Sequence, residues 1–182
     1  MTTIGLISDT HIPEAGDALP DEIWPVFKGV DLILHAGDLH ILDVLDRLED
    51  IAPVRAVRGN GDVGLGGRQP VPDDPRLKPT DLFSVDGLRI GMTHGIPLPE
   101  EMPGIPLDKT MNRLFGDAVD VLVFGDTHVD YVKQHGSSLL INPGSPTLPY
   151  NLVGHLGTVG ILEIRNGRPK ARIVPLGKWP VR

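Results

Sequence analysis

Short apolar runs without polar alternation recur along the first half of the chain, and each run stops at an acidic, amide or imidazole side chain. The stretches 4–11, 31–36 and 53–57 have this form, and amphipathic stretches at 21–28 and 40–51 separate them. Continuous runs of Val, Ile and Leu are typical of strands buried on both faces, whereas apolar side chains spaced by four residues indicate helices. The alternation of strand and helix predicts parallel strands joined by crossovers.

The second half of the chain predicts short strands joined by tight turns. Asp86-Gly87 lies between two runs at 82–85 and 88–92, and this dipeptide suits a two-residue hairpin turn. Asn166-Gly167 marks another hairpin in the same way. The other expected elements are loops at 12–20, 63–80 and 96–106, a helix at 107–115, and strands at 119–124, 129–134, 139–142, 158–165 and 171–174. An α/β half followed by a hairpin-rich half predicts two sheets packed face to face, with helices outside.

The composition is that of a globular protein with one domain. The 182 residues are enough for one well-buried core and too few for two, so a single domain over 1–182 is expected. Apolar residues make up 40% and charged residues 23% of the chain, which excludes a disordered or fibrous class. No stretch approaches the about 18 apolar residues of a membrane span and no basic stretch precedes the first apolar run, so a cytoplasmic location is expected.

Charge and cysteine content narrow the chemistry further. The 17 basic and 24 acidic residues give a formal net charge of −7, which argues against stable binding to nucleic acid. A phosphorylated substrate is still allowed, because a bound cation can reverse the local field. The chain has no cysteine, so disulfides and zinc–thiolate sites are excluded and any metal must be bound by oxygen and imidazole ligands.

Seven candidate metal ligands follow the apolar runs directly. Asp9 and His11 are two residues apart and are expected to point the same way from a strand end, and Asp126-Thr127-His128 repeats their pattern. Since parallel strands end at one edge of a sheet, such side chains are expected to meet there. Carboxylates mixed with imidazole suit Mn, Fe, Zn, Co or Mg, and a bridging carboxylate suits two ions about 3.5–4 Å apart. The full set is Asp9, His11, Asp38, Asn60, His94, Asp126 and His128.

Three other histidines have simpler interpretations. His35 lies within an apolar run and is expected to be a core residue. His135 and His155 lie in polar stretches that contain glycine, and we expect them at the surface.

Five short motifs occur in a fixed order along the chain, namely Asp9-X-His11, Gly37-Asp38, Gly59-Asn60-X-Asp62, His94-Gly95 and Gly125-X-Thr127-His128. In this order they resemble the calcineurin-like metallophosphoesterase superfamily, over residues 3–164. The small size, Arg58, and Asn142-Pro143-Gly144-Ser145 resemble its compact bacterial and archaeal phosphodiesterase branch, which also includes the retromer subunit of eukaryotes. The resemblance implies an α/β fold, a four-layer α/β/β/α sandwich of two mixed sheets.

The resemblance also implies roles for the candidate ligands. Asp9, His11 and His128 would hold a first metal, Asn60, His94 and Asp126 a second, and Asp38 would bridge them. Asp38, Asn60 and His94 would also be the catalytic residues.

Two divalent ions are implied, with Mn favoured and Fe, Zn, Co, Ni or Mg as alternatives, and they would supply a hydroxide that attacks phosphorus. We therefore predict a metal-dependent phosphodiesterase acting on a phosphorylated small molecule or nucleotide-like substrate. A dimer or tetramer is left open, because relatives often form them. The alternative is a weakly active or inactive metal-binding module for protein interaction, like the retromer subunit.

Three positions depart from the family pattern. Asp126 stands where His is usual, which adds negative charge and favours harder ions such as Mn or Mg. Gly61 stands where His or Cys is common, so residue 61 cannot protonate a leaving group, and His40 is left open as a substitute. Tyr150 stands where relatives often have an Arg, and Arg58 is left open as the replacement phosphate contact.

Overall fold

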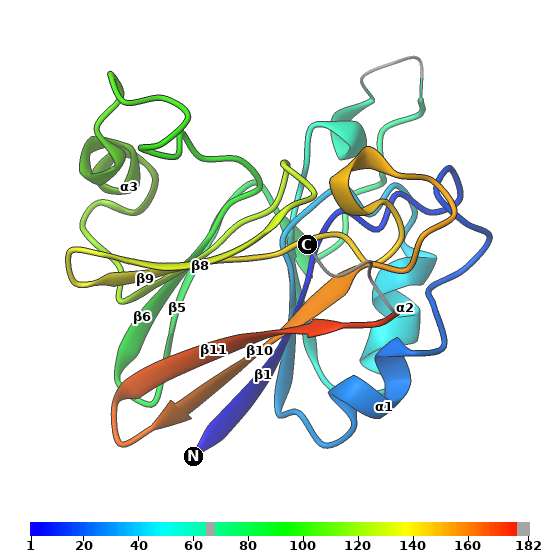
Figure 1. Cartoon of the computed structure of the whole chain (residues 1–182), viewed down its shortest axis with the longest axis horizontal. Helices are drawn as coiled ribbons and strands as arrows, with labels where there is room; N and C mark the ends of the chain where they lie inside the picture. The colour runs from blue at the N-terminus through cyan, green and yellow to red at the C-terminus, as the bar shows by residue number, and fades with distance from the viewer. Residues whose placement is uncertain (65–67, 178–182) are drawn as a thin grey trace.

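The apolar runs of the first half pair as central strands of a six-stranded sheet in the computed structural model, which describes residues 1–64 and 68–177 (Figure 1). β1 pairs in parallel with β2 and antiparallel with β10, while β2, β3 and β4 continue in parallel. The strand order is β11-β10-β1-β2-β3-β4. The bounds are β1 Thr2–Ile7, β2 Leu32–His35, β3 Val54–Val57, β4 Leu77–Lys78, β10 Thr158–Arg165 and β11 Arg168–Pro175.

A second, five-stranded sheet has the order β5-β6-β7-β9-β8. The predicted hairpin at Asp86-Gly87 joins β5 and β6, and β6, β7 and β9 run in parallel. Both sheets are therefore mixed, as the sequence predicted. The bounds are β5 Asp81–Val85, β6 Leu88–Met92, β7 Val121–Val123, β8 Asp130–His135 and β9 Ser138–Pro143.

The helices cover the outer faces of the two sheets. α1 (Ile23–Phe27) and α2 (Asp43–Glu49) pack on the six-stranded sheet, and α3 (Leu107–Phe115) packs on the other (Figure 1). The predicted four-layer α/β/β/α sandwich is thus confirmed. Among the described residues, no helix is long and apolar enough to cross a bilayer.

Burial on both faces explains why the first strand reads as a continuous apolar run. Ile4 and Leu6 of β1 point into the core between the two sheets, whereas Ile7 points to the core under the helices. All three side chains are fully buried, and successive side chains of a strand alternate between its faces. Each face of β1 must therefore be apolar, which is the pattern that the sequence has.

Several predicted boundaries were wrong, each for a local reason. α2 begins at Asp43 and not at residue 40, because the backbone of His40 has φ 71°, which a right-handed helix cannot contain. The expected loop 63–80 contains the short strand β4, and the short 3₁₀ helix Gly61–Val63 runs into its start. Residues 65–67 of that loop lie outside the described residues. A further 3₁₀ turn at Pro149–Asn151 was not predicted.

His35 is a core residue, as predicted, and it makes stability depend on pH. It is fully buried, Gly37 N–H donates to its Nδ1 (3.2 Å), and its Nε2 lies 3.1 Å from Thr10 Oγ1. Burial lowers the pKa of His35 from 6.5 to about 3. The unfolded chain therefore takes up a proton near pH 6.5 that the folded chain excludes, so this stabilisation is complete above pH 6.5 and is lost as pH falls toward 3.

Acidification from pH 7 to pH 5 should lower the free energy of unfolding of the wild type. We expect this decrease to be about 2 kcal/mol larger than the decrease in His35→Gln. The measurement is urea unfolding of the metal-free proteins at both pH values. His135→Gln, which removes a more exposed imidazole on β8, is the control variant. If the free energy of unfolding depends on pH equally in the wild type and in His35→Gln, the lowered pKa of His35 is contradicted.

Candidate metal centre

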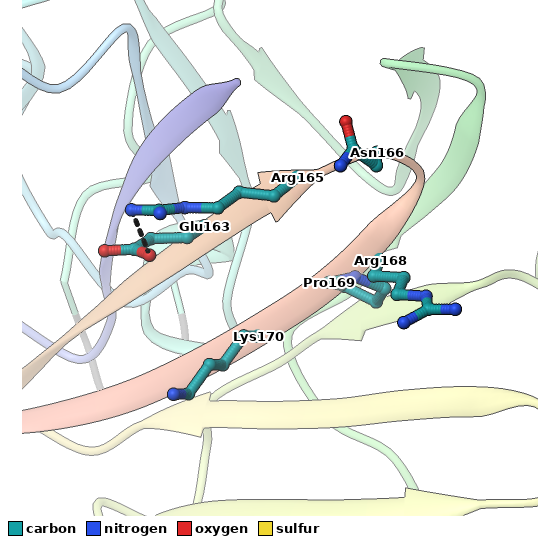
Figure 2. A pocket seen from close by; sticks show the side chains of 6 residues that line it. All are labelled: Glu163, Arg165, Asn166, Arg168, Pro169 and Lys170. Carbon is teal, nitrogen blue, oxygen red and sulfur yellow. Dashed lines mark ion pairs between the residues drawn. The ribbon is translucent and has the colours of Figure 1, made fainter.

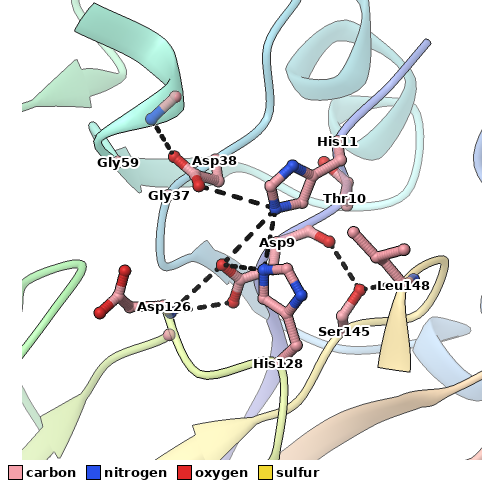
Figure 3. A network of polar contacts seen from close by, with 12 residues as sticks. Asp9, Thr10, His11, Gly37, Asp38, Gly59, Asp126, His128, Ser145 and Leu148 are labelled. Carbon is pink, nitrogen blue, oxygen red and sulfur yellow. Dashed lines mark hydrogen bonds and ion pairs between the residues drawn. The ribbon is translucent and has the colours of Figure 1, made fainter. Parts of the chain in front are cut away.

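The seven candidate ligands lie in the loops that leave the carboxyl ends of β1, β2, β3, β6 and β7. The first three strands belong to the six-stranded sheet and the last two to the five-stranded sheet. The ligand edges of the two sheets therefore meet, and the site is built from both (Figure 3). This is the edge at which ligands bind in open α/β sheets.

The backbone is left-handed at five of the seven candidate ligands. Asp9 and His11 have φ 54° and 46°, Asp38 has 55°, and Asp126 and His128 have 73° and 57°. Such angles cost a residue other than glycine about 1–3 kcal/mol, and they persist where surrounding contacts impose them. Here Asp9 N–H donates to Gly37 O (2.9 Å) and His11 N–H donates to Asp38 O (3.0 Å). Tight left-handed turns, and not strand alternation, aim the side chains of Asp9, His11 and His128 at the centre.

One group of ligand atoms comes from Asp9, His11 and His128, which lie within 4.8 Å of one another. His11 Nε2 is 3.0 Å from His128 Nε2, and His128 Nε2 is 3.6 Å from Asp9 Oδ1 (Figure 3). Two ligands bound at right angles to one ion at about 2.1 Å would be about 3.0 Å apart. The group therefore fits a single divalent ion.

A second group comes from Asp9, Asp38 and His94. His94 Nδ1–H donates to Ala36 O (2.7 Å), which leaves Nε2 facing the centre, as is common for metal-binding histidines. His94 Nε2 lies 3.5 Å from Asp38 Oδ2 and 3.0 Å from Asn60 Oδ1. Asp38 Oδ2 is also 3.6 Å from His11 Nε2, so this carboxylate stands between the two groups.

Asp126 lies at the rim of the centre and not within either group. Its side chain is about half exposed, with Oδ1 3.5 Å from His94 Nε2. Its backbone N–H donates to both oxygens of Asp9, each at 3.2 Å. The residue thus orients Asp9 through its main chain while its carboxylate remains within reach of the second group.

Residues 2–167 match the family model described as the calcineurin-like phosphoesterase superfamily domain. The chain belongs to this superfamily. Its members bind divalent metals and include hydrolases that act on phosphate esters. The resemblance inferred from the five motifs is therefore confirmed.

Individual relatives agree with this assignment. The chain is 39% identical over 148 residues to a probable metallophosphoesterase of Methanothermobacter thermautotrophicus, covering 80% of this chain and 78% of that protein. It is 31% identical over 122 residues to the phosphodiesterase YfcE of Escherichia coli K12, covering 66% of this chain and 58% of that protein. The crystal structure of a Vps29 variant from Entamoeba histolytica superposes with TM-score 0.68 at 25% identity, covering 96% of this chain and 99% of that one.

Burial sets the charge states of this phosphoesterase-family centre. Desolvation raises the pKa of Asp9 to about 7 and lowers that of His11 to about 4. Burial opposes protonation of His94, but its hydrogen bond to Asp38 and the charges of Asp9 and Asp38 raise its pKa to about 9. Cations bound here would compete with protons on Asp9 and His94, so metal affinity should fall as pH falls.

A layer of buried polar side chains behind the ligands was missed by sequence reasoning. Ser145 Oγ–H donates to Asp9 O at 2.7 Å (Figure 3). Thr147 Oγ1–H donates to Thr10 O at 2.7 Å. Asn142 Nδ2–H donates to Gly125 O at 2.9 Å. Asn142, Ser145 and Thr147 are all buried, so they hold the ligand loops in place as well as forming a turn. The available signal was polar residues directly after a buried strand.

Gly125 is required by close packing. A Cβ added there would lie 1.9 Å from Ser8 Oγ and 2.6 Å from Asp9 Oδ2. No side chain can be accommodated at that distance without moving the ligand loop.

Arg58, which the sequence left open as a phosphate contact, has other partners in the structure. The guanidinium of Arg58 donates to Val71 O (2.7 Å) and Pro72 O (2.9 Å) and pairs with Asp73. Arg58 therefore anchors residues 71–73 of the loop, and its guanidinium is engaged there. Tyr150, where relatives often have Arg, donates its backbone N–H to His128 O at 3.1 Å.

Two surface hollows differ in their relation to the centre. One, of about 760 Å³, lies at the β10–β11 turn, where Arg165 pairs with Glu163 (Figure 2). That turn is at the amino end of β1, opposite the ligand edge. The other, of about 580 Å³, borders the rim of the centre at Asp126, and its lining also includes Ile96, Met102, Ile105, Lys109 and Arg113.

Proposed function

We propose that the protein is a metal-dependent phosphodiesterase working with two divalent ions at this edge. The observation that carries the proposal is the pair of overlapping ligand groups, which share Asp9 and have Asp38 between them. Two ions sharing a carboxylate form a centre suited to phosphoryl transfer. The phosphodiesterase YfcE among the relatives supports the same activity.

In this proposal Asp9, His11 and His128 would hold one ion, Asn60, His94 and Asp126 would hold the other, and Asp38 would be shared by both. When bound, the ions supply Lewis acidity that activates water and neutralises charge on the phosphoryl oxygens. Asp38, Asn60 and His94 fix the positions of the reacting groups. The anionic oxygen ligands suit Mn best among the candidate ions.

The groove beside Asp126 supports a diester substrate. Its apolar residues Met102 and Ile105 are about half exposed, and Lys109 and Arg113 supply positive charge near them. One ester arm of a nucleotide-like substrate fits such a surface, because the base is apolar on its faces and polar at its edges. Arg58, which could have served a dianionic monoester, is bound elsewhere.

The test is to strip the full chain of metal, reload it with Mn, Zn or Mg, and assay a chromogenic phosphodiester beside the matching monoester. We expect about two ions per chain and a kcat/KM for the diester at least about tenfold above that for the monoester. Preference for the monoester would contradict the diester assignment.

The second candidate is a metal-binding module for protein interaction, and the likeness to Vps29 favours it. Gly61, which cannot donate a proton, also fits a protein with weak catalysis. Two bound ions with no hydrolysis of either ester under any metal would support the module and contradict the enzyme.

We further propose one domain over 1–182, a cytoplasmic location, and a dimer or tetramer that size-exclusion chromatography would reveal.

A further inference from the structure

The centre contains a third Asp-X-His turn that the proposed ligand set leaves out. Asp38-Leu39-His40 follows β2 as Asp9-Thr10-His11 follows β1. Asp38 and His40 have φ 55° and 71°. These angles are in the same left-handed region as those of the pairs Asp9 with His11 and Asp126 with His128. The same local geometry therefore turns the His40 side chain toward the ligands.

His40 is buried and has one ring nitrogen without a partner. Its side chain is 2% exposed, and within residues 1–64 and 68–177 its Nε2 has no hydrogen-bond partner. Its Nδ1–H donates to Glu14 Oε2 at 2.7 Å, and Arg68 Nε–H donates to the other Glu14 oxygen at 2.7 Å. A carboxylate on one ring nitrogen, which leaves the other nitrogen's lone pair free, is the usual arrangement around metal-binding histidines.

The free nitrogen lies among the ligands. Ligand atoms of His11, Asp38 and His40 are within 4.8 Å of one another. The rings of His11 and His40 meet edge to face with centroids 4.5 Å apart. A Cβ on residue 61 would lie 2.4 Å from His40 Nε2, so the glycine at this position is what leaves room for the imidazole.

We propose that His40 Nε2 is a further ligand of the ion held by His11 and Asp38, with Glu14 orienting its ring. The inference rests on the proposed metal centre. It accounts for the buried, unpartnered nitrogen and for the small residue at position 61.

The test compares metal binding by the wild-type chain, His40→Asn and His135→Gln. Asn tolerates the left-handed backbone, and its amide lies near the place of Nδ1, so Nε2 is removed with little other change. We expect His40→Asn to bind one of two Mn²⁺ ions at least about 100-fold more weakly in calorimetric titration, and the visible spectrum of the Co²⁺ form to change. Glu14→Gln should weaken the same ion about tenfold, and His135→Gln should not weaken it.

The outcomes separate this inference from the proposed function. A wild-type chain that binds no ion would overturn both. If the wild type binds two ions and His40→Asn keeps the same metal affinity and Co²⁺ spectrum, only the coordination by His40 is overturned, and the metal centre stands. In that case, a fall in kcat with intact metal binding would assign His40 to the leaving group instead. Urea unfolding of the metal-free variants, with a midpoint near that of the wild type, shows that the fold is intact.

Discussion

Replacing Asp38 by Asn is expected to abolish hydrolysis and to reduce the metal content from about two ions per chain to less than one. Asp38 Oδ2 lies 3.6 Å from His11 Nε2 and 3.5 Å from His94 Nε2, so both ligand groups lose the same anionic oxygen. Its Oδ1 already accepts the Gly61 N–H at 2.7 Å. An amide cannot orient an acceptor to all of these groups and carries no charge. We expect kcat/KM to fall by at least about 10³-fold.

The charge of Asp38 is the basis of this expectation. Burial would raise its pKa, but the hydrogen bond and charge of His94 and the Gly61 N–H lower it to about 2. The carboxylate is thus anionic at neutral pH and can share two cations. The measurement is metal analysis by mass spectrometry together with diester hydrolysis.

Asp43→Asn, on the exposed face of α2, provides a matched control and should keep both properties. An Asp38→Asn protein that retained two ions and wild-type kcat/KM would contradict the dinuclear assignment.

Replacing Asp62 by Asn is expected to lower the free energy of unfolding by about 3 kcal/mol. Asp62 is fully buried, and its carboxylate accepts the backbone N–H groups of Asp38 (2.9 Å), His40 (2.9 Å) and Gly59 (2.8 Å). The amide nitrogen of Asn would face at least one of these donors without a bond. Each buried donor left unpaired costs about 1–3 kcal/mol.

The loss would extend to the metal centre. Asp62 supports the left-handed backbone of Asp38 and His40, so the ligand loop after β2 should become less ordered. We expect metal affinity to fall with stability, although Asp62 itself is no ligand. The measurements are urea unfolding with a chelator present and a Mn²⁺ titration.

Asp73→Asn is the comparison for Asp62. That carboxylate is fully exposed and pairs with Arg58 at the surface, so the change should lower the free energy of unfolding far less than Asp62→Asn does. Similar losses for the two variants would show that Asp62 does not hold the loops.

The strand-end location of the ligands was predictable because it follows from chemistry that is local in the chain. Asp9, Asp38 and Asn60 come directly after apolar runs, and runs that are buried on both faces form parallel strands with one common edge. The position of His40 was not predictable in this way. The sequence around it has helical spacing, and its backbone angle depends on an acceptor at Asp62, 22 residues away along the chain.

The partners of the Arg58 side chain were likewise not predictable from the local sequence. A positive residue beside a phosphate motif favours a substrate contact, but the carbonyls of Val71 and Pro72 lie within its reach and take its guanidinium. Which acceptor an arginine meets depends on how a loop folds back, and the local sequence does not encode that.

The sequence by itself determined the strand and helix order, the two-sheet architecture, the family and the chemical types of the ligands, because each depends on residue pattern over short stretches. Only the tertiary structure decided that the ligand edges of the two sheets meet, that the Asp-X-His pairs turn through left-handed backbone, and that His40 has a free nitrogen beside Gly61. These features depend on distances between segments remote in the chain, and packing of the whole core sets those distances.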